Sequence, residues 1–351
     1  MPSVPVPAGM YSRQDVDDRE NRIAVVGASG FIGSHVLASG HAHSLDIAAV
    51  RCPRVRVEDW RRPVTSAESW RRDNAAELER FVRSLVGFDV VVNAAGMGAP
   101  TSTDEQSLYS ANAVQPLLVA RACRLAGVRR LVHISTAAVQ GRLDPLDETA
   151  RHHPFSPYTY SKAEGERLLL EGDGDVPGEL IVYRPSSVQG VERAITRRLA
   201  RLAHAAIVPI SGKGDQPLPL ALIDNVAEGI LFSALSPFSA PIVIQPSEHL
   251  TTRRLFECFS ARRLLPLPPR PVGWVLSGIS LPLRYLPALS TSVRGLELLY
   301  RGQRVAESTL TGWGFVPPVG HEGWEALGSA MAETPSGTAT APRGATASSP
   351  P

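Results

Sequence analysis

Lysine is almost absent from this chain. Of its 351 residues, 36 are lysine or arginine, but only Lys162 and Lys213 are lysines. Because arginine supplies nearly all other positive charge, a lysine here indicates a place that needs a compact ammonium group. The net charge of +2, without a dense basic block, argues against a nucleic-acid partner.

Cysteine is also scarce. Cys52, Cys123 and Cys258 are far apart and lack the spacing of a metal or disulfide site. We therefore expect a reduced, cytoplasmic protein with no bound metal. The first 20 residues have no apolar core typical of a signal peptide, so we expect 1–20 to be a disordered lead-in and 333–351 a disordered tail.

Long apolar runs are missing too. The Pro- and Leu-rich segment 264–289 comes closest, but its uninterrupted apolar part is shorter than the ~20 residues that a spanning helix needs. We expect no transmembrane segment. The segment predicts a helical lid over a substrate pocket, and contact of 272–289 with a membrane surface is the alternative.

Glycines follow the first apolar run. Ile23–Val26 predicts a buried strand, and the pattern becomes helical after the glycines. This order is typical of a turn whose backbone approaches a dinucleotide pyrophosphate, although an ordinary strand-to-helix turn is the alternative. The predicted contacts are Gly27, Ser29, Gly30, Phe31, Ile32 and Gly33.

The residue after the second predicted strand bears on the choice of cofactor. In such folds an acid there binds the ribose 2′-hydroxyl, whereas an arginine suits a 2′-phosphate. Arg51, which follows Asp46–Val50, therefore favours NADP over NAD, with Ser29 as a second phosphate contact. The alternative is a solvated arginine in an arginine-rich chain, which would leave NAD as the cofactor. Asp59 follows a third predicted strand, Val55–Val57, and is either an adenine contact or a surface acid.

Strands and helices alternate through the rest of the chain, which predicts a doubly wound parallel α/β sheet. Further strands are predicted at Asp89–Val92, Leu131–Ile134, Leu180–Tyr183 and Ile242–Gln245. Helices are predicted at Ala75–Val86, Leu108–Ala126, Ala194–Ala206 and Leu222–Ala234, with an irregular loop at Pro209–Pro219. We expect a dinucleotide-binding domain at 21–190, joined again by about 220–250, and a substrate-binding region formed by 191–219 and 251–332.

A tyrosine and a lysine stand four residues apart on one predicted helix face. They are Tyr158 and Lys162, and Thr136 follows the strand before them. A carbonyl under reduction needs a proton, which a phenol delivers when an ammonium group lowers its pKa and a hydroxyl shares its hydrogen bond. These three residues therefore predict a catalytic set, with an ordinary surface lysine as the alternative. Tyr160 lies on another face of the helix.

Together these motifs resemble the extended short-chain dehydrogenase/reductases, and within them the NAD-dependent epimerase/dehydratase family acting on nucleotide sugars. The matching segments are 27–33 (G-A-S-G-F-I-G), 93–96 (N-A-A-G), 135–141 (S-T-A-A-V-Q-G), 158–162 (Y-x-x-x-K), 182–190 (V-Y-R-P-S-S-V-Q-G), 222–230 (L-I-D-N-V-A-E-G-I) and 311–317 (T-G-W-G-F-V-P). The resemblance implies a Rossmann-type fold. It further implies cofactor contacts at Ala94, Ala95, Gly96, Asn112, Lys162, Pro185 and Val188, and substrate contacts at Met97, Thr136, Ala137 and Ser187.

The resemblance implies an NAD(P)-dependent oxidoreductase for a keto or hydroxyl group of a nucleotide-linked sugar, most simply a 4-ketoreductase. An epimerase or dehydratase is an alternative, and so is a reductase of a sterol-like or polyketide ketone. A non-enzymatic NADP sensor would not need the intact catalytic set. A homodimer is a further expectation.

Some positions depart from the family pattern. Sugar-nucleotide epimerases usually have Asn at the place of Ser187, Arg within 216–218, and Tyr at Gln140 and Gln189. Arginines that follow the sixth predicted strand could replace the missing phosphate contacts, or they could form a solvated helix face. They are Arg193, Arg197, Arg198 and Arg201.

Overall fold

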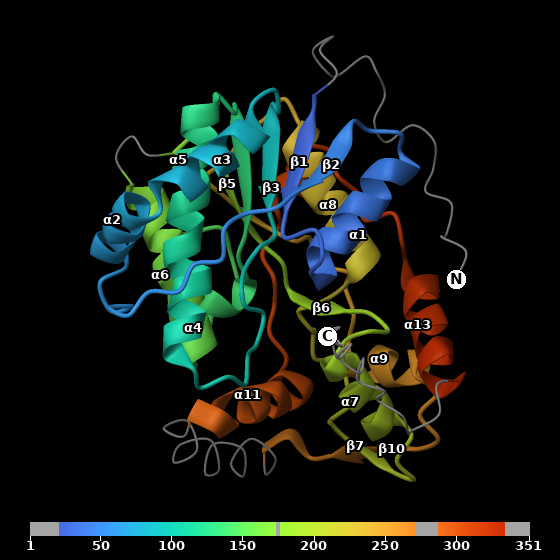
Figure 1. Ribbon diagram of the computed structural model, residues 1–351. Coiled ribbons are helices and arrows are strands. Elements are labelled where there is room, and N and C mark those ends of the chain that lie inside the picture. Colours follow the sequence, from blue (N-terminus) through green and yellow to red (C-terminus); the bar gives the residue numbers. More distant parts are fainter. Residues whose placement is uncertain (1–20, 173–175, 271–286, 334–351) are drawn as a thin grey trace, which may run out of the picture.

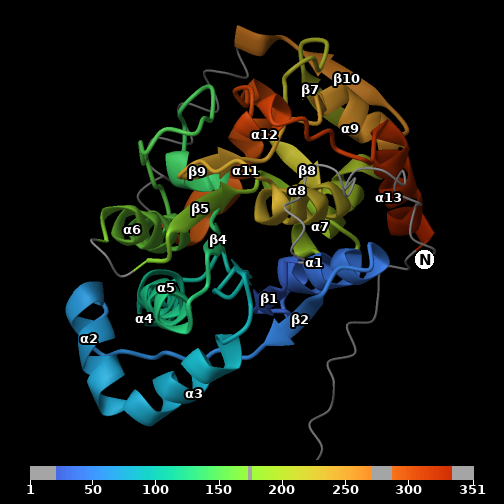
Figure 2. The ribbon, with the colours of Figure 1, turned by 90° about the horizontal axis from the view of Figure 1, so that it is seen from above.

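The computed structural model describes residues 21–172, 176–270 and 287–333. Its centre is a six-stranded parallel sheet with the order β2-β1-β3-β4-β5-β9 (Figures 1 and 2). The strands are β1 Ile23–Val26, β2 Ile47–Val50, β3 Val90–Asn93, β4 Arg130–Ile134, β5 Glu179–Arg184 and β9 Ile242–Ile244. Strand order reverses between β1 and β3, which is where such sheets bind ligands. The predicted fold class is confirmed.

Successive side chains of each strand pack on opposite faces of the sheet. Ile23 and Val25 belong to a core shared with α8, and Ala24 and Val26 to a core shared with α3 and α5. Figure 2 shows α1 and α8 on one side of the sheet and α3 and α5 on the other. The flanking helices are α1 Phe31–Ala42, α2 Pro63–Asp73, α3 Ala75–Leu85, α5 Gln115–Ala126, α6 Pro157–Glu171 and α8 Ile223–Leu235.

A second apolar core lies beyond the carboxyl ends of the sheet strands. It contains Leu255, Phe256 and Trp324, all buried. The elements of this part are β6 Ser187–Gln189, paired with β8 Leu220–Leu222; β7 Val208–Ser211, paired with β10 Leu264–Leu267; and the helices α7 Ala194–Ala203, α9 Thr252–Cys258, α11 Pro287–Arg301, α12 Thr309–Gly312 and α13 His321–Glu333. The domain boundaries stay a prediction.

The strand predicted at Val55–Val57 is wrong. This segment runs extended, but side chains rather than a neighbouring strand bind its backbone. The Val57 N–H donates to Ser110 Oγ (3.1 Å), and the Val57 carbonyl accepts from Gln106 Nε2 (3.0 Å). Val57 packs against Trp70 of α2. Burial of its valines therefore explains the apolar pattern without sheet pairing.

The predicted helix Leu108–Ala126 is not one continuous α-helix. It consists of α4 Glu105–Tyr109, a π-helical turn Ser110–Val114 and α5. Pro116 has no N–H for the carbonyl of Asn112, so a regular α-helical bond is impossible there. Wide turns of this kind are often found at functional sites.

Smaller differences concern element ends. The predicted loop Pro209–Pro219 begins inside β7, and the helix predicted to reach Ala206 ends at Ala203. Helix α2 was not predicted because its polar sequence has little apolar periodicity; Pro63 occupies its first turn. The strand predicted at Ile242–Gln245 joins the sheet as β9, where it pairs with β5.

Within the described ranges, no helix is both long and apolar enough to cross a bilayer. The helical lid predicted within 264–289 is wrong at its start, because Leu264–Leu267 forms β10 and pairs with β7. The rest of that segment, and the membrane-surface contact predicted for 272–289, fall mostly on 271–286, outside the described residues.

Candidate active site

The turn between β1 and α1 is shaped by two close backbone approaches. Gly27 has φ +82°, and a Cβ on it would lie 2.4 Å from the Ala95 nitrogen. A Cβ on Gly33 would lie 2.3 Å from the Gly27 carbonyl oxygen. Gly30 differs, since a Cβ there would meet only the Gly27 oxygen, at 3.2 Å, and the residue is exposed. Gly27 and Gly33 are thus required by the packing of the protein itself, whereas Gly30 is the less crowded and more exposed glycine at the start of α1. Its predicted contact with a pyrophosphate stays a prediction.

The loop after β3 is fixed by Asn112 from the π-helical turn. Asn112 Oδ1 accepts from the Met97 N–H (2.9 Å), and Asn112 Nδ2 donates to the Met97 carbonyl (3.2 Å) and to Ser161 Oγ (3.0 Å). A Cβ on Gly96 would lie 2.9 Å from Asn112 Oδ1 and 3.2 Å from Lys162 Nζ. Asn112 therefore joins the loop after β3 to α6, and Gly96 lets the lysine approach the backbone.

Helix α6 presents Tyr158 and Lys162 from its first two turns. Ser156 caps it in a capping box with Thr159, whose Oγ1 accepts from the Ser156 N–H (2.9 Å), and Pro157 takes the first helical position. These local signals fix where the helix begins. The i,i+4 spacing then places tyrosine and lysine on one face.

The catalytic set predicted from sequence meets in space. The Thr136 side chain is near enough to the Tyr158 phenol to lower its pKa. Lys162 is buried, and its Nζ donates to the Ile134 carbonyl at the end of β4 (2.9 Å). Tyr160, by contrast, is 52% exposed.

Burial is the largest influence on the pKa values of Tyr158 and Lys162. Desolvation lowers the pKa of Lys162 to about 8, and Glu166 one turn later opposes this shift. Desolvation raises the pKa of Tyr158, while the charge of Arg193 and the hydrogen bond from Thr136 act in the opposite direction. Without further stabilisation the phenol is protonated at neutral pH, as a proton donor must be.

A buried ion pair, which was not predicted, lies one helical turn after the lysine, and its carboxylate favours the charged form of Lys162. Arg184 of β5 and Glu166 of α6 are fully buried, with Arg184 Nη2 2.6 Å from Glu166 Oε2. His152 Nε2 lies 2.9 Å from the same oxygen. The Arg184 guanidinium also donates to the Thr149 carbonyl (2.7 Å). The only available sequence signal was Glu166 at the i+4 position from Lys162.

A second unpredicted feature is a clamp formed by α11. Arg294 Nη2 donates to the Gly141 carbonyl (3.0 Å) and to Gln303 Oε1 (2.6 Å), and Glu297 pairs with Arg142 (2.9 Å). Gly141 closes the short 3₁₀ turn Ala137–Gln140, which begins directly after Thr136.

The same helix also reaches the loop after β3. Thr291 Oγ1 donates to the Pro100 carbonyl (2.7 Å). In Figure 1, α11 lies across the end of the molecule below α4. It thus joins the two loops that contain the predicted substrate contacts Met97, Thr136 and Ala137.

The predicted adenosine contacts lie apart from this centre. Ser29 and Arg51 are exposed, and Arg51 directly follows β2. Asp59 is exposed and lies 3.8 Å from Arg62. Their roles towards a cofactor stay predictions.

The remaining predicted contacts surround the turn after β5. The Pro185 carbonyl accepts from the Ala137 N–H (2.9 Å), which joins the ends of β4 and β5. Val188 is buried in the core, and its role towards a cofactor stays a prediction. Ser187 is exposed, and its hydroxyl accepts from Gln189 Nε2 (3.1 Å).

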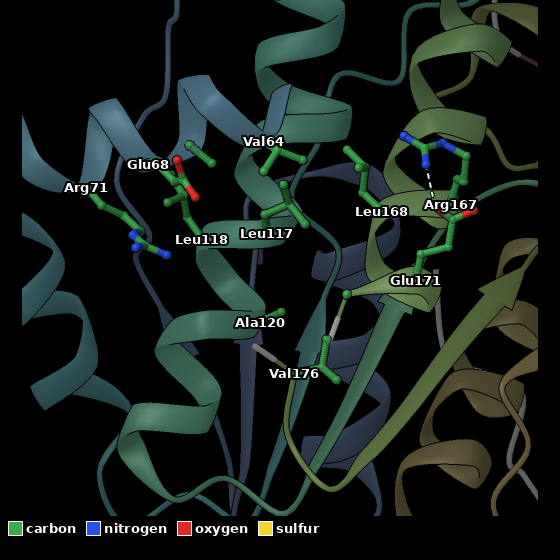
Figure 3. A pocket seen from close by; sticks show the side chains of 12 residues that line it. Val64, Glu68, Arg71, Leu117, Leu118, Ala120, Arg167, Leu168, Glu171 and Val176 are labelled. Carbon is green, nitrogen blue, oxygen red and sulfur yellow. Dashed lines mark hydrogen bonds and ion pairs between the residues drawn. The ribbon is translucent and has the colours of Figure 1, made fainter. Parts of the chain in front are cut away.

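A separate hollow of about 400 Å³ lies between α2, α5 and the C-terminal end of α6 (Figure 3). Leu117, Leu118 and Leu168 line it, with Arg167 and Glu171 near its rim. Thr136, Tyr158 and Lys162 do not line this hollow. It is therefore separate from the catalytic set.

The family model for the NAD-dependent epimerase/dehydratase family matches residues 23–243. The chain belongs to this family. Members of the family are NAD(P)-dependent oxidoreductases and epimerases, so the expected class of enzyme and a nicotinamide cofactor are confirmed at that level.

Two curated relatives illustrate the range of the family. A Stigmatella aurantiaca 4-hydroxy-2-methyl-3-oxo-4-farnesyl-3,4-dihydroquinoline-1-oxide ketoreductase is 30% identical over 224 residues, covering 61% of this chain and 64% of that protein. The chain thus spans a little under two thirds of that relative. A Mycobacterium tuberculosis dTDP-4-dehydrorhamnose reductase is 27% identical over 322 residues, covering 78% of this chain and 96% of the relative.

Solved structures share the fold. Thermus thermophilus UDP-glucose 4-epimerase in complex with NAD has a TM-score of 0.57 and 21% identity, covering 89% of this chain and 99% of that one. RMD from Pseudomonas aeruginosa in complex with NADPH has a TM-score of 0.56 and 19% identity, with the same coverage. At these identities the likeness extends to the fold alone.

Proposed function

We propose that this enzyme is an NADPH-dependent ketoreductase whose substrate is a 4-keto sugar linked to a nucleotide. The observation that supports this most is the buried Lys162, bonded to the Ile134 carbonyl at the end of β4, on the same face of α6 as Tyr158, with Thr136 near the phenol. When bound, the nicotinamide supplies the hydride for the carbonyl carbon. Tyr158 donates its proton to the carbonyl oxygen, and Thr136 shares that hydrogen bond and orients the phenol.

Lys162 has two roles in this proposal. Its ammonium group favours the phenolate that remains after proton transfer, and it is placed to bond a ribose hydroxyl of the cofactor. Gly30 and the N-terminal backbone of α1 bind the pyrophosphate. Ser29 and Arg51 bind the 2′-phosphate that distinguishes NADPH from NADH.

The proposal favours net reduction over epimerisation. An epimerase retains its NAD through oxidation and re-reduction and gains from strong contacts to the diphosphate of its substrate. In this chain the segment 216–218 makes contacts within the protein instead. Gln216 Nε2 donates to the Ser211 carbonyl (2.9 Å), and the Pro217 carbonyl accepts from the Gln303 N–H (2.9 Å). Leu218 is buried.

The test uses the full chain as purified. We expect it to contain little bound cofactor and to oxidise added NADPH, followed by its fluorescence, when given a 4-keto nucleotide sugar. Dissociation constants for NADPH and NADH, compared with those of Arg51→Ala, test the cofactor preference, which should fall in the variant. Copurification with stoichiometric NAD⁺ and interconversion of two sugar nucleotides without added cofactor would identify an epimerase instead.

A second candidate is reduction of a ketone on an apolar substrate that bears no nucleotide. The exposed Ser187, in place of the usual Asn, and the 30% identical ketoreductase support it. Assays with a polyketide-like 3-oxo ester beside the nucleotide sugar separate the two candidates, because only one substrate should support NADPH oxidation.

A further inference from the structure

One arginine lies at the junction between the cofactor turn and the catalytic tyrosine. The Arg193 guanidinium carbon is 5.1 Å from the centroid of the Phe31 ring, on the first residue of α1. Its charge also acts on the Tyr158 phenol. Arg193 therefore packs against the predicted pyrophosphate site at the start of α1, and its charge reaches the proposed proton donor.

The turn that presents Arg193 is rigid. Gly190 follows the buried Gln189, and its N–H donates to Thr196 Oγ1 (3.1 Å), which itself donates to Gln189 Oε1 (2.9 Å). The Arg193 N–H donates to the Gly190 carbonyl (3.0 Å). A Cβ on Gly190 would lie 2.9 Å from the Phe31 ring, so the turn packs directly on α1.

The guanidinium has no anionic partner among the described residues. Its Nε is buried and makes no hydrogen bond there. Two arginines of α7, the helix that follows Arg193, are in a different environment. Arg197 donates to the Glu192 carbonyl (2.9 Å), and Arg198 is exposed to solvent. A buried polar atom without a partner is costly, and this cost is removed when a ligand supplies an acceptor.

We propose that Arg193 is a substrate-binding residue whose guanidinium binds an anionic oxygen of the substrate next to the Tyr158 phenol. Planar guanidinium groups bind carboxylates and phosphates through two parallel hydrogen bonds. The anion is therefore either a carboxylate close to the reacting ketone or the diphosphate of a nucleotide. This inference builds on the proposed ketoreductase function, since it assigns the charge of that enzyme's substrate.

The experiment measures anion binding and needs no turnover, so its outcome is independent of the reductase assay. The full chain saturated with NADP⁺ is titrated by calorimetry with inorganic pyrophosphate and with malonate. Wild type is compared with Arg193→Gln, Arg193→Lys and the matched control Arg198→Gln. We expect at least one anion to bind wild type and the control equally, and the Gln variant about 10- to 100-fold more weakly, with Lys between them.

The anion that depends on Arg193 identifies its source: pyrophosphate points to a diphosphate and malonate to a carboxylate. Three results would overturn the inference. They are equal affinity in wild type and Arg193→Gln, binding of neither anion to wild type, and a loss of affinity for NADPH in Arg193→Gln, which would assign the arginine to the cofactor. A shift in the pH profile of turnover with unchanged anion affinity would likewise show that Arg193 acts only on Tyr158.

Discussion

Tyr158 is subject to opposing influences that suit a proton donor. Burial keeps the phenol protonated, while Arg193 and Thr136 favour its ionised form. In the proposed mechanism, the proton therefore stays on the phenol until the carbonyl oxygen accepts it, and neighbours that are already positioned then stabilise the phenolate.

Tyr158→Phe should lower turnover by about 10²–10⁴-fold, because general acid catalysis contributes about that much. The affinity for NADPH and the melting temperature should stay close to wild type, since only one hydroxyl is removed. Steady-state rates and cofactor titration check this. Tyr160→Phe is the control: its side chain is 52% exposed, and equal losses in both variants would show that the wrong tyrosine was chosen.

Burying the charged ammonium group of Lys162 lowers the stability of the folded protein. Its pKa of about 8 in the folded protein is below its ordinary value of 10.5. Between these two pH values the unfolded chain holds a proton that the folded protein lacks, so stability rises with pH in this window and the full cost applies below pH 8.

Lys162→Met should therefore raise the free energy of unfolding at neutral pH by about 1–3 kcal/mol, after allowance for the lost hydrogen bond to Ile134, while turnover is lost. Urea unfolding of wild type and variant, repeated from neutral to alkaline pH, measures the gain in stability. It also shows whether the rise in stability above pH 8, expected for wild type, is absent from the variant. Lys213→Met, at the only other lysine, which is exposed, should change neither. A destabilised Lys162→Met with normal activity would contradict the assignment.

At the scale of elements, α11 holds together two loops that contain predicted substrate contacts, the loop after β3 and the turn after Thr136. It bonds to Pro100 after β3 and to Gly141 after the Thr136 turn, so its position sets the spacing of the loops. Arg294 is central to this clamp because it joins Gly141, Gln303 and Glu297.

Arg294→Met should raise KM for the substrate about tenfold and lower stability by about 1–3 kcal/mol, because buried acceptors lose their donor. The dissociation constant for NADPH should not change, since the β1–α1 turn is separate from α11. Kinetics, cofactor titration and urea unfolding check the three parts. Ser292→Ala, an exposed position of the same helix, is the control, and a weakened affinity for NADPH with unchanged KM would refute the role given to α11.

At the scale of the whole molecule, Glu248 joins α8, which packs on the sheet, to α13 of the second apolar core. Its carboxylate accepts from the Leu222 N–H and Asn225 Nδ2 (2.9 Å each) at the start of α8, and from Trp324 Nε1 of α13 (2.7 Å). Burial nevertheless raises its pKa from 4.5 to about 7. The folded protein thus holds a proton between these pH values that the unfolded chain has lost.

The contribution of Glu248 to stability should therefore decrease as pH rises from 4.5 to 7, by up to about 3 kcal/mol. Urea unfolding across this range should show a slope in wild type that Glu248→Gln lacks. Glu325→Gln, at an exposed carboxylate of α13, keeps the wild-type slope. Parallel pH profiles for wild type and Glu248→Gln would contradict this link.

The sequence by itself determined the parts that depend on neighbours in the chain. Glycine spacing predicted the β1–α1 turn, and the i,i+4 rule placed Tyr158 and Lys162 on one face. The capping residues around Ser156 fixed the start of that helix. Each of these follows from backbone geometry within a few residues. The strands of the central sheet and the shared helix face of Tyr158 and Lys162 were therefore predictable, whereas α2 was missed and the strand at Val55–Val57 was wrong.

Tertiary structure alone decided which distant groups satisfy buried polar atoms. Val57 was predicted to pair in a sheet, but side chains about 50 residues away bind its backbone. Arg184 of β5 meets Glu166 of α6, Arg294 of α11 meets Gly141 at the end of the 3₁₀ turn, and Arg193 faces Phe31 because Gly190 permits a close approach. A local pattern contains no information on such contacts, since the partner of a buried donor is chosen only when the elements pack together.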